Sequence, residues 1–312
     1  MRVILILLFC CLTPMVLSAQ AKSLSKKAMR EVQAQEEKLV GLSYVMHTDS
    51  SADQRFAACR ELIKELVETL KTPNSYSYPF DSLRGVVVKE SPDQKFRIFS
   101  WELHVDADLY RHYGAIQFNE SKLKLIPLMD RGDELRENPE NVVLTPDNWL
   151  GYVTYDIVPA GKYNGETMYF LFGFDRYGKF RRQKILDVLT FDQFGKPSFG
   201  APVFRTYTPE GLLMEDRKRI ILMYGAESAV VMRHDIYNNR IIYENLVMMP
   251  GNSGEGPVNV PDGSYHSLEL DDQGIWFEVE KVFDHKYEEA PREAGKAPAG
   301  QDLFGRPKGT DN

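Results

Sequence analysis

Two strand-like segments and the turn between them occupy residues 166–190, with the sequence ETMYFLFGFDRYGKFRRQKILDVLT. Both segments are rich in aromatic or β-branched residues, which strands favour. In the turn Asp175–Gly178, the aspartate can accept hydrogen bonds from the turn backbone, and the glycine can take the positive φ that closes a hairpin with a bulge. The stretch therefore predicts an antiparallel hairpin in a β-rich protein.

The same pattern extends over residues 79–284. Further runs of β-branched and aromatic residues predict strands at 86–88, 96–99, 115–118, 149–158, 217–223, 228–236, 239–248 and 274–283. Turn signals separate these runs, among them Ser91–Gln94, Asn164–Gly165 and two more Asp-x-x-Gly tetrapeptides at 192–195 and 271–274. Many short strands joined by short turns predict a mainly β fold, an antiparallel meander arranged as a barrel, a sandwich or a propeller-like stack.

A helical lead-in precedes the strands, over residues 22–78. Its second half spaces apolar residues by three and four, which gives a helix one apolar stripe. The stripe consists of Phe56, Cys59, Leu62, Ile63, Leu66, Val67 and Leu70. Ser51 and Gln54 fit a capping box, and Pro73 ends the helix. The first half, Leu24–Leu42, is richer in Lys, Glu and Gln and predicts a solvated helix or a mobile lead-in.

Residues 1–21 show the three-part pattern of a secretory signal peptide. Arg2 supplies a positive start, Val3–Leu17 is mostly apolar, and Ser18–Ala21 offers small residues for cleavage. The apolar run of about 15 residues is shorter than the roughly 20 that a membrane-spanning helix needs. We therefore expect an exported protein, periplasmic or extracellular, without a transmembrane segment after cleavage. An uncut membrane anchor is the alternative.

The C-terminal residues, the cysteines and the net charge exclude several classes of protein. Residues 285–312 are rich in Gly and Pro from Ala290 onward, which predicts a disordered tail. Cys10 and Cys11 lie in the signal, so the mature chain keeps only Cys59, which can form no internal disulfide and no cysteine-based zinc site. The net charge of −7 argues against a nucleic-acid partner, which would require a basic face.

The glycine-rich run Gly251–Pro257 gives the sharpest catalytic signal. It resembles the nucleophile loop of trypsin-like serine peptidases, in which backbone N–H groups stabilise an oxyanion. In that hydrolase, Ser253 would be the nucleophile, His104 the base, and Asp133 or Asp147 the orienting acid. The small residues that those peptidases place before the histidine are missing. A plain loop between two strands is therefore the competing interpretation.

His104, Asp106, Asp108 and His112 form a cluster of metal-binding residue types. On an extended strand, residues 104, 106 and 108 share one face, and a zinc or iron ion could use such a set. The segment is polar and lies between two predicted strands, so a surface loop is the competing interpretation. No organic cofactor is predicted, because the chain has no P-loop and no dinucleotide-binding glycine pattern.

Aromatic residues offer a third functional hypothesis. The chain has Trp101, Trp149 and Trp276 together with 17 Phe and 16 Tyr residues. Exposed aromatic faces stack on sugars and would predict carbohydrate binding, whereas buried rings serve the core of a β protein.

Four stretches together resemble a group of uncharacterised exported bacterial proteins. They are Ser91–Trp101, Asn148–Gly151, Tyr169–Phe204 and Val260–Tyr265, within a resemblance that covers roughly residues 50–283. The resemblance implies a bacterial exported protein and transfers no catalytic residue. Because no catalytic set is complete, the sequence favours a non-catalytic binding or structural module with a protein or glycan partner over an enzyme.

Overall fold

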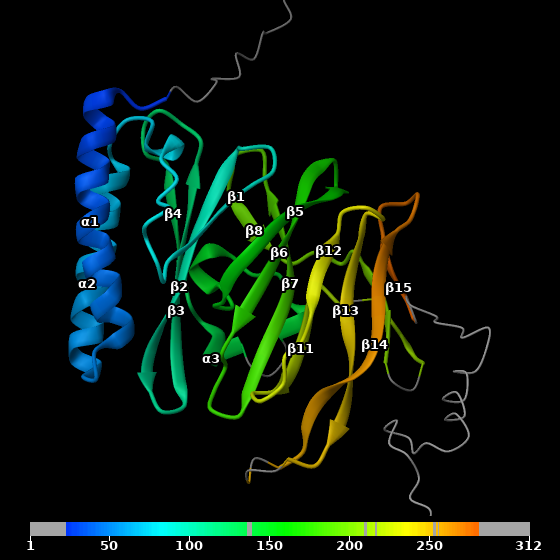
Figure 1. Cartoon of the computed structure of the whole chain (residues 1–312). Helices are drawn as coiled ribbons and strands as arrows, with labels where there is room; N and C mark the ends of the chain where they lie inside the picture. Colours follow the sequence, from blue (N-terminus) through cyan, green and yellow to red (C-terminus); the bar gives the residue numbers. More distant parts are fainter. Residues whose placement is uncertain are drawn as a thin grey trace, which may run out of the picture.

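The computed structural model describes residues 23–135, 139–208, 211–215, 217–251, 254 and 256–280. This part of the chain forms a helical hairpin and three open β-sheets, stacked as successive layers (Figure 1). The mainly β, antiparallel fold with an N-terminal helical segment is thus confirmed. The predicted signal peptide and the predicted tail lie outside the described residues. In the described part, no helix is both long and apolar enough to cross a membrane.

The helical layer consists of α1 (Lys26–Thr48) and α2 (Ala52–Leu70). The predicted cap is present, because the Ser51 hydroxyl accepts a hydrogen bond from the Gln54 N–H at 3.5 Å. In the predicted stripe of α2, the fully buried members are Cys59, Leu62, Leu66 and Leu70. The helix α1 is more than a solvated lead-in, because the face that carries Val32, Leu39 and Met46 is buried in the same core.

The first sheet is built from β1 (Val87–Glu90), β2 (Phe96–Asp106), β3 (Leu109–Phe118) and β4 (Leu125–Met129), paired in that order. Along β2, Phe99, Trp101 and Leu103 pack in the core shared with the helices, while Phe96 and Ile98 pack in the core shared with the second sheet. Both β2 and β3 run through the polar segment that predicts a loop, and only a two-residue turn at 107–108 remains.

The second sheet has the order β11-β7-β6-β5, and β8 also pairs with β7. Its strands are β5 (Val153–Tyr163), β6 (Glu166–Asp175), β7 (Arg181–Phe191), β8 (Pro197–Phe199) and β11 (Ile220–Gly225). The predicted hairpin of residues 166–190 is the pair β6–β7. This sheet is covered on both sides, which explains its nearly continuous apolar sequence. Leu171 and Ile185 lie in one core, and Phe170 and Leu186 lie in the other.

The turn after β6 differs from the prediction. Tyr177, rather than Gly178, has the positive φ, at 58°. Gly178 serves a close approach instead, because a Cβ at this position would lie 2.9 Å from the Asp108 Oδ1 of the β2–β3 turn. The other two Asp-x-x-Gly turns match the prediction, with φ of 76° at Gly195 and 83° at Gly274.

The third sheet has the order β10-β9-β15-β14-β13-β12, in which only β15 and β9 are parallel. Its strands are β9 (Phe204–Tyr207), β10 (Leu213–Met214), β12 (Met232–Asp235), β13 (Arg240–Met249), β14 (Val258–Leu270) and β15 (Trp276–Val279). The sequence pattern does not predict β14, which contains an irregularity. Leu246 pairs with Pro261 and Glu244 with Tyr265, so residues 262–264 form a bulge.

Two buried arginines attach irregular segments to strands. On β2, Arg97 donates to the carbonyls of Tyr78 (2.6 Å) and Ser75 (3.0 Å), which lie between the helices and the first sheet. Arg219 lies just before β11 and pairs with Asp187 of β7, with Nε and Oδ1 3.0 Å apart and both side chains fully buried. Arg219 also donates to three backbone carbonyls, those of Pro139, Val142 and Phe199.

Replacing Arg219 should strongly destabilise the protein. Arg219→Met leaves a buried carboxylate unpaired, and we expect the free energy of unfolding to fall by about 3–5 kcal/mol. The double variant Asp187→Leu/Arg219→Met removes both charges and should recover part of that loss. Urea denaturation measures both effects. Arg205→Met is the control, because it breaks a partly exposed ion pair to Glu215 and should cost less than about 1 kcal/mol. A similar small loss for Arg219→Met would contradict the assignment.

Candidate functional site

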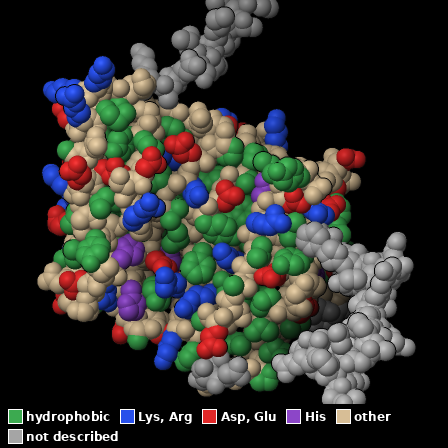
Figure 2. Space-filling model, in the orientation of Figure 1, with side chains coloured by type: hydrophobic (Ala, Val, Ile, Leu, Met, Phe, Trp, Pro, Cys, Tyr) green, Lys and Arg blue, Asp and Glu red, His purple; other side chains and the backbone are tan. Residues whose placement is uncertain are grey.

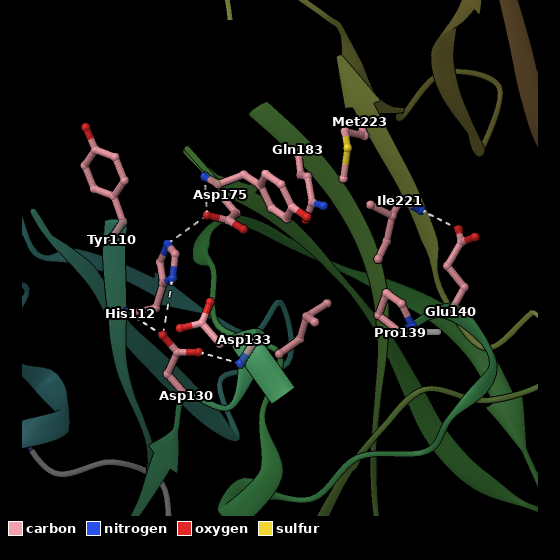
Figure 3. A pocket seen from close by; sticks show the side chains of 13 residues that line it. Tyr110, His112, Asp130, Asp133, Pro139, Glu140, Asp175, Gln183, Ile221 and Met223 are labelled. Carbon is pink, nitrogen blue, oxygen red and sulfur yellow. Dashed lines mark hydrogen bonds and ion pairs between the residues drawn. The ribbon is translucent and has the colours of Figure 1, made fainter. Parts of the chain in front are cut away.

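A cavity of about 310 Å³ opens between the first and second sheets. Its lining includes residues of α3 (Gly132–Leu135), which Figure 1 labels, and of the short helix η2 (Pro139–Asn141). Strand β3 contributes Tyr110 and His112, and β6, β7 and β11 form the opposite wall (Figure 3). The volume is at the lower end of the range of roughly 300–1,000 Å³ that is usual for small-molecule sites.

His112 is the central residue of this cavity, and its side chain is only 4% exposed. Its Nδ1 lies 3.6 Å from Asp130 Oδ2, and its Nε2 lies 3.5 Å from Asp175 Oδ1 (Figure 3). A carboxylate faces each nitrogen, and this arrangement favours the imidazolium ion, in which both nitrogens carry a proton. Nε2 nevertheless makes no hydrogen bond with any part of the chain that the structure describes.

Asp130 is fixed from several sides. Its Oδ2 accepts a hydrogen bond from the His112 backbone N–H (2.7 Å), and its Oδ1 accepts one from the Gly132 N–H (2.9 Å). Gly151 makes room for the carboxylate, because a Cβ at this position would lie 2.4 Å from Asp130 Oδ1. Gly151 also has a φ of 80°, which favours glycine. Gly151, the last residue of the stretch Asn148–Gly151, therefore leaves the space that the Asp130 carboxylate occupies at the cavity.

Asp175 is held by the unusual turn at the end of β6. Its Oδ1 accepts a hydrogen bond from the Tyr177 N–H at 2.6 Å. Positive φ is uncommon for a bulky residue such as tyrosine and is often found where a site requires it. The turn thus places both the Asp175 carboxylate and the Tyr177 side chain at the cavity.

The three titrating groups shift in a way that fits a buried cluster. Burial alone would lower the pKa of His112, but the hydrogen bond to Asp130 and the charges of Asp175, Asp130 and Glu102 outweigh it and raise this pKa. Burial raises the pKa of Asp175, and the charge of His112 offsets only part of that increase. Against the effect of burial, contacts with His112 lower the pKa of Asp130. Asp130 is therefore the stronger partner of the His112 imidazolium ion, and Asp175 is the weaker one.

Two further acids, Glu102 and Glu140, lie near this cluster, and each of them pairs with an arginine. Glu102 pairs with His112 across β2 and β3, and its Oε1 lies 2.5 Å from Arg176 Nε. The other oxygen of Glu102, Oε2, is buried and has no hydrogen-bond partner in the described chain. On the far wall, Glu140 Oε1 accepts from Arg217 (2.6 Å) and from the Ile221 N–H (2.9 Å), which fixes η2 to β11.

Of the four predicted metal ligands, only His112 lines the cavity. His104 and Asp106 are exposed near the end of the β2–β3 hairpin, and a bulge between them breaks the alternation that would put 104, 106 and 108 on one face. Asp108 instead accepts a hydrogen bond from the Lys179 backbone. No group of three or more His, Cys, Asp or Glu residues in the described chain is arranged to hold a metal ion. Figure 2 shows histidine side chains reaching the surface over this hairpin.

The structure leaves the hydrolase hypothesis untested, because Ser253 lies outside the described residues. His104 is exposed, and its ring centroid lies 5.1 Å from that of Tyr110. Of the two candidate acids, Asp133 lines the cavity from α3, and Asp147 is exposed on the short helix η3 (Pro146–Asn148).

All three tryptophans are buried, one in each core, so none offers a face to a sugar. The large exposed aromatic side chains are those of Tyr44, Phe194, Tyr207, Tyr237 and Phe277. The carbohydrate hypothesis, in its form of exposed aromatics, depends on these rings and stays a prediction.

Three larger hollows lack the chemistry of the His112 cavity. One, of about 640 Å³, lies at another edge of the same two sheets beside Phe118, Tyr169 and Phe191. The second, of about 840 Å³, adjoins Met249 and Gly251, and the third, of about 570 Å³, adjoins α1 and residues 78–82. Among their described lining residues, no buried side-chain polar atom is without a hydrogen bond. The His112 cavity is therefore the better candidate for a site.

The comparisons with protein-family models, curated proteins and solved structures found no match. The fold defines a mainly β protein of one helical and three sheet layers. The site is an acidic cleft between two of those sheets, organised around a buried histidine.

The His112 cluster should make stability depend on pH. A folded-state pKa above the ordinary value of 6.5 adds stability below about pH 6.5, and this contribution is lost as the pH rises through the raised pKa. The free energy of unfolding of the wild type should therefore fall as the pH rises from about 6.5 through the raised pKa, relative to that of His112→Gln. Urea denaturation across this range measures the difference. His104→Gln should follow the wild type, and a His112→Gln curve parallel to the wild type would contradict the cluster.

Proposed function

We propose that this protein is an exported, non-catalytic binding module, periplasmic or extracellular, which holds a small polar ligand in the cleft between its first two sheets. One observation carries the proposal: His112 is buried in the cleft wall, and its Nε2 has no hydrogen-bond partner in the described chain. An unsatisfied buried polar atom costs about 1–3 kcal/mol. A molecule bound in the cleft would supply the missing partner.

The composition of the cleft favours binding over catalysis. Its described lining contains no Ser, Thr, Cys or Lys side chain, which leaves its carboxylates and tyrosines as the groups that could act as nucleophiles. Against the effect of burial, the carboxylates that face both nitrogens of His112 raise its pKa, which favours the protonated form over the free base. The carboxylates Asp130 and Asp175 are fixed by backbone N–H groups. Groups held in place before a ligand arrives reduce the entropy that binding must overcome.

The exported location is supported by the sequence of residues 1–21 and by the resemblance to exported bacterial proteins. The fold is consistent with it, because the chain needs no disulfide when three cores already bury a large apolar surface. Cys59 is free and buried. Such a protein needs no disulfide-forming enzyme to fold in the periplasm or outside the cell.

Filling the cleft should abolish ligand binding. Ile221 lines the cleft from β11, so Ile221→Trp should occupy it. Fluorine NMR of a library of small polar fragments should identify binders of the wild type that Ile221→Trp no longer binds. Val247→Trp, at a partly exposed position of β13, is the matched control and should retain them. Equal binding by Ile221→Trp, or chemical conversion of a bound fragment, would count against the proposal.

The signal peptide should be removed during export. When the full chain is produced in a Gram-negative bacterium, mass spectrometry should find the exported protein beginning near Lys22, outside the cytoplasm. A variant with Leu7→Arg and Leu8→Arg interrupts the apolar run and should stay uncut in the cytoplasm. Recovery of the intact chain from Met1 in the membrane fraction would show that residues 1–21 are an anchor instead.

A further inference from the structure

The polar groups of the cleft set two requirements on a ligand. The Nε2 of His112 makes no hydrogen bond in the described chain, and Asp175 Oδ1, 3.5 Å away, already accepts from the Tyr177 N–H. The lining carries four carboxylates, from Asp130, Asp133, Glu140 and Asp175. Carboxylates only accept hydrogen bonds, and each can accept several, so a ligand group that donates fits beside them. A ligand group that both accepts and donates satisfies both requirements at one position.

A hydroxyl group is the simplest chemical group with this property. Its oxygen would accept from His112 Nε2–H, and its proton would be donated to the Asp175 carboxylate beside it. An anionic ligand would accept from His112, but it would also lie among four carboxylates and donate to none of them. An ammonium ligand would donate to the carboxylates, but it has no lone pair for His112 and would lie beside the imidazolium. The geometry therefore favours a neutral ligand with hydroxyl groups.

The other walls of the cleft fit a ring that carries several hydroxyls. The aromatic side chains of Tyr110 and Tyr177, together with Leu150, Ile221 and Met223, provide apolar surface for C–H groups. The amide of Gln183 lies in the same lining and can both donate and accept. The cavity of about 310 Å³ is within the size range of small-molecule sites, which suits a ligand as small as one sugar ring.

We infer that the ligand of the cleft is a saccharide, either a monosaccharide or a single sugar unit of a glycan, with a hydroxyl bridging His112 Nε2 and the Asp175 carboxylate. The inference rests on the proposed function, which makes this cleft the binding site. It differs from sugar stacking on exposed aromatics, because polar side chains of the cleft carry the recognition. Glu102, the cross-strand neighbour of His112, adds negative charge that contributes to raising the pKa of the imidazole.

Nuclear magnetic resonance of the mature chain tests the ligand class. The probes are methyl α-D-glucoside, methyl β-D-galactoside and N-acetylglucosamine, with propylamine and propionate as the cationic and anionic alternatives. At least one saccharide should shift the ring nitrogen signals of His112 in a saturable manner, whereas propylamine and propionate should leave them unchanged. The readout is on the histidine itself, so binding elsewhere on the molecule does not count.

Variants then test the bridge. Asp175→Asn keeps the shape of the side chain but removes its charge, and His112→Gln removes the donor. Each should weaken saccharide binding by about tenfold or more, measured by titration calorimetry. His104→Gln, on the same hairpin but outside the cleft, should bind like the wild type. If His112→Gln does not fold, the hydroxyl bridge is still tested by Asp175→Asn and by the His112 ring nitrogen signals of the wild type.

The outcomes separate this inference from the proposed function. If propylamine or propionate shifts the His112 signals and no saccharide does, the cleft is a binding site but the saccharide inference is wrong. If fragments bind in the cleft and are lost in Ile221→Trp while every saccharide is silent, the inference is again overturned alone. If no probe and no fragment reaches His112, both fail. Saccharide affinity that Asp175→Asn leaves unchanged overturns the hydroxyl bridge.

Discussion

The buried pair between Arg219 and Asp187 is the interaction on which the layered structure and its cleft both depend. Asp187 belongs to the central sheet, and Arg219 lies where the chain returns to that sheet after forming β9 and β10. Through the carbonyls of Pro139, Val142 and Phe199, the same guanidinium group holds the segment that carries Glu140. One side chain therefore joins β7, the end of β8 and the segment that carries Glu140, of which only β7 and β8 are also paired as strands. Arg97 plays a similar part between the helices and the first sheet.

The cleft lies where the apolar core between the first two sheets gives way to polar residues. Where β2, β3, β6 and β7 face each other with apolar residues, the space between the sheets is filled by a core. Towards the end that carries α3, the facing residues become His112, Asp175 and Gln183, which line the cavity. The site is thus the polar end of a core. Its walls are strands and short turns fixed by backbone hydrogen bonds, with acids on both sides of a single imidazolium ion.

The sequence predicts the fold class well and the site only in part. The apolar stripe of α2 and the hairpin of residues 166–190 have strong local periodicity, and both are found in the structure. Strands β4 and β14 contain Pro127 and Pro261, and β8, β9 and β10 have only two to four residues, so local pattern does not reveal them. The sequence pattern indicates His112 as a candidate metal ligand, but it groups this residue with His104, Asp106 and Asp108, which do not line the cavity. The partner Asp130, 18 residues from His112, is brought beside it by the pairing of β3 with β4, and Asp175, 63 residues away, by the stacking of the second sheet on the first.

The order of the layers has a consequence for the timing of folding. The helices, the first sheet and most of the second sheet follow one another along the chain, and neighbouring strands are mostly consecutive. Because synthesis begins at the N-terminus, these layers can assemble while the C-terminal part of the chain is still being synthesised. Strand β11 is the exception, because it joins the second sheet only after β9 and β10 have passed to the third. Ile221 and Met223 of that strand complete the cleft wall, so this wall forms late, after the other layers are in place.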